Sequence, residues 1–235
     1  MHVRAFIEEM EQLAPPDLAE EFDAGKIGLI VEGKTDITMV CCALDATPYV
    51  VQQAVMASAD MLVVHHTPLW TPLTALTGQT AGLMRALLSA EMNLYVMHTN
   101  FDRAEHGVND ALAELLSLKD IEHLTLGRIG TCSLSPVEIS RRLGGNIRIW
   151  GEIKTCNRLA LAAGSGFDPV LLDEAFAGGA DVFLSAEMKH SVARSSPLPC
   201  IEASHYSLEA PAMQRLATRM GWQYIDDPPR LKIIP

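Results

Sequence analysis

The chain has 235 residues, of which 49 % are apolar and 20 % are charged, a balance typical of packed globular proteins and not of disordered ones. Its 18 basic and 29 acidic residues give a formal net charge of −11, and no basic run exceeds Arg141-Arg142. We therefore do not expect nucleic acid as a partner, because affinity for phosphate backbones depends on clustered Lys and Arg.

The five cysteines form no C-x-x-C pair and are too few for a disulfide-stapled secreted domain. The amino terminus lacks the basic stretch and long apolar run of a secretory signal. No apolar run approaches the roughly 20 residues that a membrane span requires. We expect a soluble, cytoplasmic protein that does not contact a membrane.

Short apolar runs alternate with amphipathic stretches along the chain, which is typical of α/β proteins. The runs predict strands at 27–31, 37–43, 61–64, 94–97, 159–163, 182–184 and 200–203. Apolar spacings of three and four predict helices at 48–57, 82–90, 109–116, 136–143, 169–177 and 208–220. No long polar linker divides these elements, so we expect an N-terminal lobe over 1–125 and a C-terminal lobe over 126–235 that pack tightly as one unit.

A weak internal repeat relates the two halves of the sequence. In each half an Ala-Asp turn, Ala59-Asp60 or Ala180-Asp181, precedes a buried strand, and a later strand ends in histidine, three residues and a carboxylate. These endings are His98 to Asp102 and His205 to Glu209. Two related βαβ units would explain the repeat, and a chance likeness of two α/β segments is the alternative.

The first candidate site residues are His65 and His66, which directly follow an apolar strand. Neighbours within a strand point to opposite faces, so both can serve one site only where the strand gives way to a loop. Thr67-Pro68 favours such a break, because Pro68 has no N–H for the ladder. The alternative is one buried, hydrogen-bonded histidine beside one exposed histidine.

His98 and His205 emerge at the ends of two further strands, where open α/β sheets place their ligand sites. Asp102, in the turn after His98, is also typical of a helix cap or a salt-bridge partner. We expect Ser207 to cap the last helix, with Glu209 in its first turn and Pro211 tolerated because first-turn N–H groups have no helical partner.

Three histidines and two carboxylates at a shared sheet edge form a nitrogen and oxygen ligand set, with His98 as a fourth histidine in reserve. A single catalytic zinc takes only three protein ligands, so this set predicts two divalent metal ions. The ligand types suit Zn, Mn, Fe, Co or Ni.

The ordered motifs of the chain resemble the Nif-three-like (NGG-interacting-factor-three-like) family, whose members are also called GTP cyclohydrolase 1 type 2 homologues. The resemblance spans roughly residues 27–221 and depends on segments 43–47, 59–66, 98–102 with 107–110, 127–130, 164–166 and 204–209. It is specific because the motifs occur in order, although each is weak alone.

This resemblance implies two similar α/β lobes, each part of a three-layer α/β/α fold, with a dinuclear metal site in the cleft between them. It also implies a toroidal homohexamer. The metal ligands that it implies are His65, His66, Asp102, His205 and Glu209, with His98 beside the metals.

The sequence departs from the family pattern at two places. Thr67 stands between the His-His pair and Pro68, where the family has proline at once. Ala186 stands before Glu187 where the family has glycine, and would narrow the room for substrate if that segment lines the cleft.

Several other segments and residues each allow two structural interpretations. Gly164-Ser165-Gly166 either cradles a phosphate or makes a tight strand-to-helix turn. Asp45 and Thr47 either form hydrogen bonds that orient the metal-binding side chains or cap the helix that begins at Pro48, and we favour capping. Three further residues could either line a cleft or have ordinary packing roles. They are Arg128, Trp70 and Trp150.

We expect a metal-dependent hydrolase that uses a metal-activated water on a nucleotide-like or phosphorylated small molecule. His98 or Glu187 would shuttle the proton. The alternative function is a non-enzymatic, metal-binding oligomeric scaffold or regulator.

Overall fold

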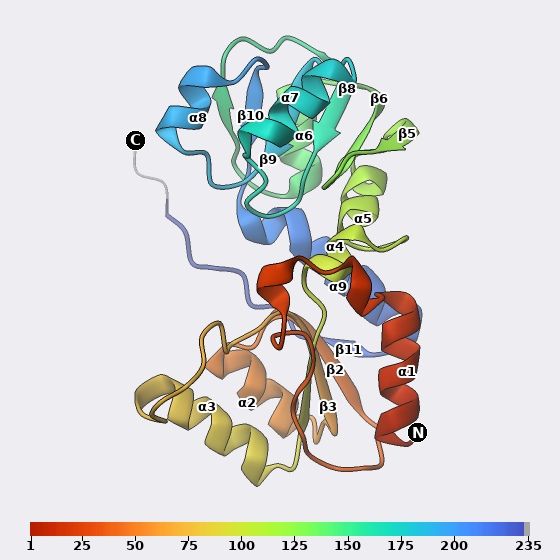
Figure 1. Cartoon of the computed structure of the whole chain (residues 1–235), viewed down its shortest axis with the longest axis vertical. Coiled ribbons are helices and arrows are strands. Elements are labelled where there is room, and N and C mark those ends of the chain that lie inside the picture. The colour runs from red at the N-terminus through yellow and green to blue at the C-terminus, as the bar shows by residue number, and fades with distance from the viewer. Residues whose placement is uncertain (233–235) are drawn as a thin grey trace. The chain divides into compact units, whose positions relative to one another are not determined.

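The computed structural model describes residues 1–232, which divide into two compact units (Figure 1). Unit 1 contains Met1–Ala104 and the segment from Met213 onward, and unit 2 contains Glu105–Ala212. This division differs from the expected boundary between residues 125 and 126. The chain returns to unit 1 because strand β11 (Gln223–Tyr224) pairs in parallel with β2 (Val40–Asp45).

Unit 1 is built on a five-stranded sheet of order β1-β4-β3-β2-β11. Strands β3 (Met61–His66) and β4 (Asn93–Val96) run parallel to β2, whereas β1 (Gly28–Val31) is antiparallel to β4. The helices and turns of this unit are α1 (Val3–Leu13), η1 (Pro16–Leu18), η2 (Glu21–Asp23), α2 (Pro48–Met56), α3 (Gly78–Ser89) and α4 (Thr99–Arg103).

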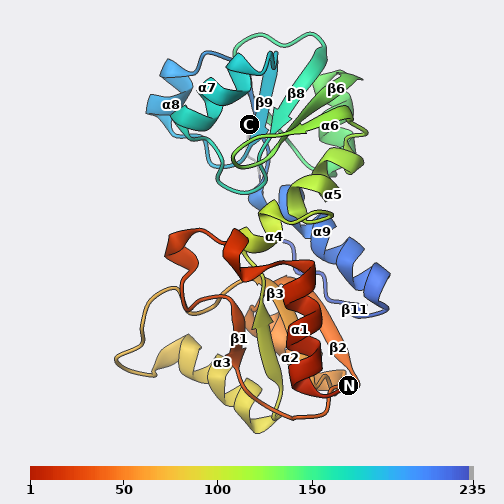
Figure 2. The ribbon, with the colours of Figure 1, turned by 45° about the vertical axis from the view of Figure 1, so that its right-hand side comes forward.

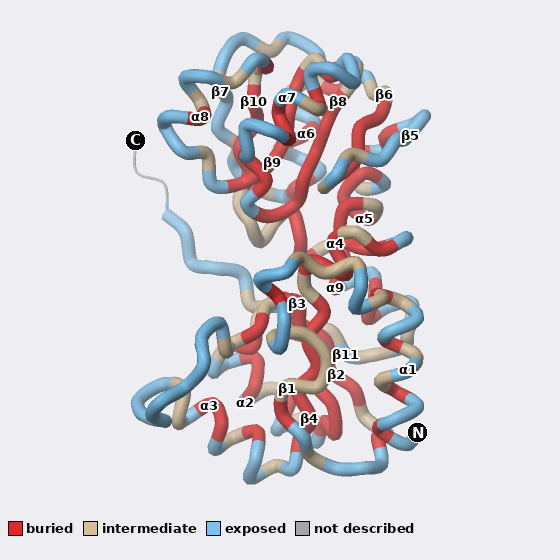
Figure 3. The backbone as a smooth tube through the Cα atoms, viewed as in Figure 1, coloured by how far each residue is buried: buried red, intermediate tan, exposed pale blue. Residues whose placement is uncertain are grey.

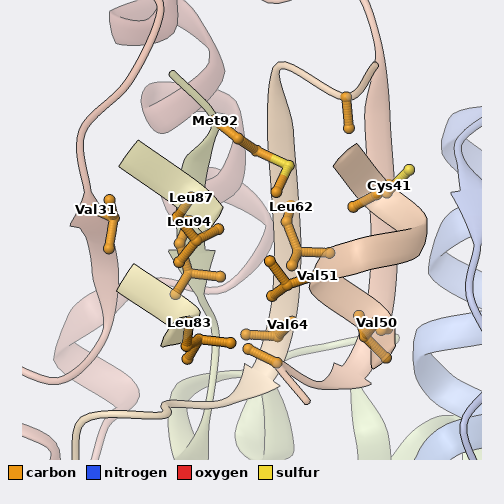
Figure 4. Close-up of a cluster of buried hydrophobic side chains, with 14 of the residues drawn as sticks. Val31, Cys41, Val50, Val51, Leu62, Val64, Leu83, Leu87, Met92 and Leu94 are labelled. Carbon is orange, nitrogen blue, oxygen red and sulfur yellow. The ribbon is translucent and has the colours of Figure 1, made fainter. Parts of the chain in front are cut away.

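Helices cover both faces of this sheet, and for this reason its central strands are mostly apolar, with polar residues confined to their ends. Alternate residues such as Leu62 and Val64 pack with Val51 of α2 and Leu87 of α3 (Figure 4). On the other face lies α1 (Figure 2). Its Phe6 stacks on Trp222 and meets Tyr95 edge to face. Each fully buried side chain of this size contributes roughly 1.5–3 kcal/mol to the free energy of unfolding.

Unit 2 has a six-stranded sheet of order β5-β6-β8-β9-β10-β7. Its strands are β5 (Lys119–His123), β6 (Arg128–Leu134), β7 (Arg148–Trp150), β8 (Cys156–Leu161), β9 (Val182–Ser185) and β10 (Cys200–Glu202). Its helices are α5 (Val108–Leu115), α6 (Pro136–Leu143), α7 (Pro169–Ala177) and α8 (His190–Ser195), and α9 (His205–Met220) begins here. Burial is concentrated in β8, β9 and β10, whereas β5 is exposed throughout (Figure 3).

The internal repeat corresponds to a shared topology. The order β1-β4-β3-β2 in unit 1 matches β7-β10-β9-β8 in unit 2, with the first strand antiparallel and the other three parallel. Asp60 accepts hydrogen bonds from the backbone N–H groups of Thr38 and Met39, just before β2. Asp181 accepts equivalent bonds from Asn157 and Arg158 in β8. The Ala-Asp turn thus joins neighbouring parallel strands in both units.

The predicted strands and helices all occur, most of them with shifted ends, and the mixed α/β fold is confirmed. Strands β5, β6, β7 and β11 and helices α1, α4 and α8 were not predicted. The expected start of the last helix is corrected, because α9 begins at His205 and the Ser204 hydroxyl accepts from the Ser207 N–H. Pro211 therefore lies inside the helix and not in its first turn.

Among residues 1–232, no helix is both long enough and apolar enough to cross a membrane.

Candidate metal centre

Three imidazoles gather at the carboxyl ends of β3 and β4 in unit 1. One ring nitrogen from each of His65, His66 and His98 lies within 4.8 Å of the others. Their ring centroids are 4.8 to 5.6 Å apart. His65 is buried and His66 is half-buried, and both belong to the cluster because β3 ends at His66.

The two histidines of β3 are each held through Nδ1. His65 Nδ1 lies 2.7 Å from the carbonyl oxygen of Met97. His66 Nδ1 lies 2.8 Å from a carboxylate oxygen of Asp45, its register partner at the end of β2. Asp45 thus positions a histidine, whereas Thr47 caps α2 by accepting from the Val50 N–H. Our preference for capping was correct for Thr47 only.

His98 is held by Asp23, a residue that the sequence did not single out. Its Nδ1 lies 2.9 and 3.0 Å from the two carboxylate oxygens of Asp23, which is completely buried. The same carboxylate accepts from the N–H and hydroxyl of Thr99. Asp23 lies 75 residues before its partner, so no local motif joins the two positions.

Asp102 faces this cluster from the short helix α4. Its carboxylate is buried, and one oxygen lies 3.5 Å from Nε2 of His65. Asn100 holds the turn, because its side chain accepts from the His98 N–H and donates to the Ala14 carbonyl oxygen. The predicted residues His65, His66, His98 and Asp102 therefore meet within unit 1.

Aromatic side chains border His98. The Trp70 ring meets His98 edge to face at 5.1 Å, and the Phe22 ring does so at 6.2 Å. Both aromatic side chains are exposed, by 43 % and 55 % respectively, which leaves room for a ligand to contact them. Lys26 adds a positive charge, with Nζ 5.4 Å from the centroid of the Trp70 ring.

The second set of candidate residues lies in unit 2. His205 and Glu209 are one turn apart on α9, with Nε2 and a carboxylate oxygen separated by 2.9 Å. Glu187 lies 2.9 Å from Nδ1 of His205. Its backbone φ of +63° is unusual for a residue with a side chain. Such conformations concentrate at functional sites.

At Gly164 the backbone passes close to the side chains of His205 and Glu209. A Cβ at this position would lie 2.3 Å from a carboxylate oxygen of Glu209, and φ is +68°. The Gly166 N–H donates to the hydroxyl of Ser185, and α7 begins three residues later with Asp168 as its cap. The loop is therefore a tight strand-to-helix turn that packs beneath His205 and Glu209.

Arg128 and Trp150 have packing roles. The buried Arg128 guanidinium pairs with Asp110 at 2.5 Å and donates to the Gly127 carbonyl. Trp150 Nε1 donates to Glu202.

The four candidate histidines share one arrangement. In each, Nδ1 faces a carboxylate or carbonyl oxygen, so the ring presents Nε2 as the ligand atom. Metal-binding histidines are usually oriented in this way. The described residues thus include histidine and carboxylate groups that could bind a metal.

Fold and site together define a mixed α/β protein of two repeated units that carries histidine and carboxylate groups suited to metal ions. The family model of Duf34/NIF3 (NGG1p interacting factor 3) matches residues 1–228. The chain belongs to this family.

Proteins named GTP cyclohydrolase 1 type 2 homolog are similar in sequence. Those of Streptomyces coelicolor and Methanocaldococcus jannaschii are 31 % and 33 % identical over 92 % and 89 % of this chain, and 87 % and 90 % of their own length.

Solved structures match the fold. Reduced HcgD from Methanocaldococcus jannaschii has a TM-score of 0.82 at 30 % identity and covers 95 % of this chain and 96 % of its own. The Staphylococcus aureus protein SA1388 has a TM-score of 0.88 at 22 % identity and covers 100 % of this chain and 99 % of its own, which is a likeness of fold.

Proposed function

We propose that this protein binds two divalent cations and hydrolyses a nucleotide-like or phosphorylated small molecule with a metal-activated water. The proposed ligands are His65, His66 and Asp102 of unit 1 and His205 and Glu209 of unit 2. Zn, Mn, Fe, Co and Ni all suit such nitrogen and oxygen ligands.

One observation carries this proposal: Nδ1 of all four candidate histidines is held by an oxygen acceptor. Three of these acceptors are carboxylates, from Asp45, Asp23 and Glu187. A hydrogen-bonded carboxylate orients the imidazole and raises the basicity of its other nitrogen. A histidine needed only for packing does not require a buried carboxylate such as Asp23, whose desolvation is costly.

When bound, the cations would lower the pKa of a coordinated water to about 7 and so supply hydroxide near neutral pH. The protein holds the ligands in orientation through the contacts above. We assign proton transfer to His98, because Asp23 holds its Nδ1 while Nε2 remains directed into the cluster. Glu187 is a second proton carrier in this proposal, and its contact with His205 adds a positioning role.

Trp70, Phe22 and Lys26 support the proposed substrate class. Exposed aromatic rings beside His98 suit a planar base, and the Lys26 ammonium suits a phosphate. The name of the relatives, GTP cyclohydrolase 1 type 2 homolog, agrees with a purine nucleotide.

Elemental analysis of the purified protein tests metal binding. We expect about two metal equivalents per chain, and fewer in Glu209→Ala. The matched control is Glu8→Ala on the exposed face of α1, which should keep full occupancy. Full occupancy in Glu209→Ala would contradict the ligand role of Glu209.

Turnover is tested with a panel of nucleotides and phosphoesters in the presence and absence of added Mn or Zn. Metal-dependent hydrolysis that is lost in His65→Ala supports the enzyme. Metal bound without turnover of any substrate favours the alternative, a metal-binding scaffold or regulator. We also propose a toroidal hexamer, and light scattering coupled to gel filtration would contradict it by giving the mass of a monomer.

A further inference from the structure

Two cysteines outside the candidate metal ligands lie side by side on neighbouring strands of unit 2. The sulfur atoms of Cys132 on β6 and Cys156 on β8 are 3.7 Å apart. The pairing of these strands is irregular between Thr131 and Leu134, which is where Cys132 lies. An S–S bond is about 2.05 Å long, so the sulfur atoms need to approach by roughly 1.7 Å.

We propose that Cys132 and Cys156 form a dithiol site that reacts with a low-molecular-weight disulfide and closes to an intramolecular disulfide bond.

Cys132 is the attacking thiol in this proposal. It is half-buried, so a small disulfide can reach it, whereas Cys156 is fully buried. The hydrogen bond with Cys156 lowers the pKa of Cys132 and so increases its reactive thiolate fraction. The same hydrogen bond is the main cause of a raised pKa at Cys156, and burial of that thiol raises the pKa further.

The remaining cysteines are poor competitors. All three are buried, and they are Cys41, Cys42 and Cys200. Burial raises the pKa of Cys41 to about 11 and also raises the pKa values of Cys42 and Cys200. Low thiolate content and lack of access both slow thiol–disulfide exchange.

The exchange has two balanced steps. The Cys132 thiol loses its proton to solvent, and the thiolate attacks one sulfur of the small disulfide. This step forms a mixed disulfide and releases one small thiolate, which takes up a proton from solvent. The Cys156 sulfur then attacks Cys132, which closes the bridge and releases the second small thiolate. The proton of the Cys156 thiol passes to the Asp181 carboxylate, whose oxygen lies 3.5 Å from Cys156 Sγ, and then to the second small thiolate. Two protein thiols are oxidised and one small disulfide is reduced to two thiols.

The test uses the full chain and oxidised glutathione as the probe. After native treatment and alkylation, intact mass should show the loss of two hydrogens and two fewer alkylated thiols, and peptide mapping should join Cys132 to Cys156. Cys156→Ser should instead accumulate one glutathione at Cys132. Cys132→Ser should form neither product, and the control Cys200→Ser should form the bridge as the natural chain does.

Either of two results would overturn the proposal. The first is a natural chain that remains fully reduced although iodoacetamide alkylates Cys132 under the same native conditions. The second is bridge formation that persists in Cys132→Ser. Thermal melting of each variant shows whether it is folded, and Cys156→Ala replaces Cys156→Ser if the serine is not tolerated at this buried position.

Discussion

Nδ1 of His98 lies 2.9 Å from a carboxylate oxygen of Asp23, whose side chain is completely excluded from solvent. The same carboxylate accepts a hydrogen bond from the Thr99 N–H, at the start of the helix that carries Asp102. Asp23 therefore connects the orientation of one imidazole to the placement of a neighbouring carboxylate.

Asp23→Asn is expected to weaken metal binding by 10- to 100-fold, the usual effect of removing a carboxylate that orients a metal-binding histidine. The amide keeps the shape of the side chain but loses the charge and one acceptor. Metal titration followed by calorimetry measures the change. The exposed Asp17→Asn should titrate like the natural chain, and equal affinities for both variants would remove Asp23 from the site.

Glu187→Gln separates two roles of this carboxylate. If Glu187 orients His205 through the 2.9 Å contact, the variant should lose metal affinity by about 10-fold or more. If Glu187 only carries a proton, metal occupancy should stay full while kcat falls. We expect the loss of affinity, measured by elemental analysis at limiting metal, with the exposed Asp173→Asn as control.

Gly164→Ala should be more harmful than a matched substitution elsewhere. Gly164 and Gly144 have nearly the same positive φ, +68° and +66°, but only the Cβ at 164 would meet a side chain, Glu209, at 2.3 Å. Gly144→Ala should therefore cost about 1 kcal/mol of unfolding free energy from backbone strain alone.

Gly164→Ala should cost more than this and should also lower metal occupancy, because Glu209 must move. Urea unfolding and elemental analysis of both variants measure the two effects. Similar unfolding free energies with full occupancy in both would show that Glu209 tolerates the methyl group.

Asp60 should make the stability of the fold sensitive to acid. Burial alone would raise its pKa, but hydrogen bonds from Lys34, Thr38 and Met39 lower the pKa far below its usual value. The folded state therefore binds the proton less readily than the unfolded state. The resulting stabilisation is present above the unfolded pKa of about 3.9 and decreases as the pH falls below it.

Asp60→Asn should lower the unfolding free energy by about 1.5–3 kcal/mol at pH 7, the range for hydrogen bonds to a charged group. Urea unfolding at pH 7 and near pH 3 should show a smaller difference from the natural chain at the lower pH. The exposed Asp36→Asn should show little change at either pH. A difference for Asp60→Asn that grows on acidification would contradict this account.

The sequence was informative wherever local pattern and packing agree. Helices α6 and α7 were predicted from apolar spacing with the bounds that the structure shows, and in both a proline at the first position and a capping side chain, Ser135 or Asp168, mark the start. The less informative elements lack such signals. β5 is exposed along its whole length, and β11 has only two residues, so neither has a buried run to mark it.

By itself the sequence determined the α/β class and the histidines and carboxylates at the strand ends, because strand burial and the endings His98 to Asp102 and His205 to Glu209 are local features. Only the tertiary structure decided which side chains hold these histidines. Asp23, Asp45 and Glu187 lie 75, 21 and 18 residues from their partners. A contact across that distance depends on strand pairing and loop path, and therefore leaves no periodic mark in the chain.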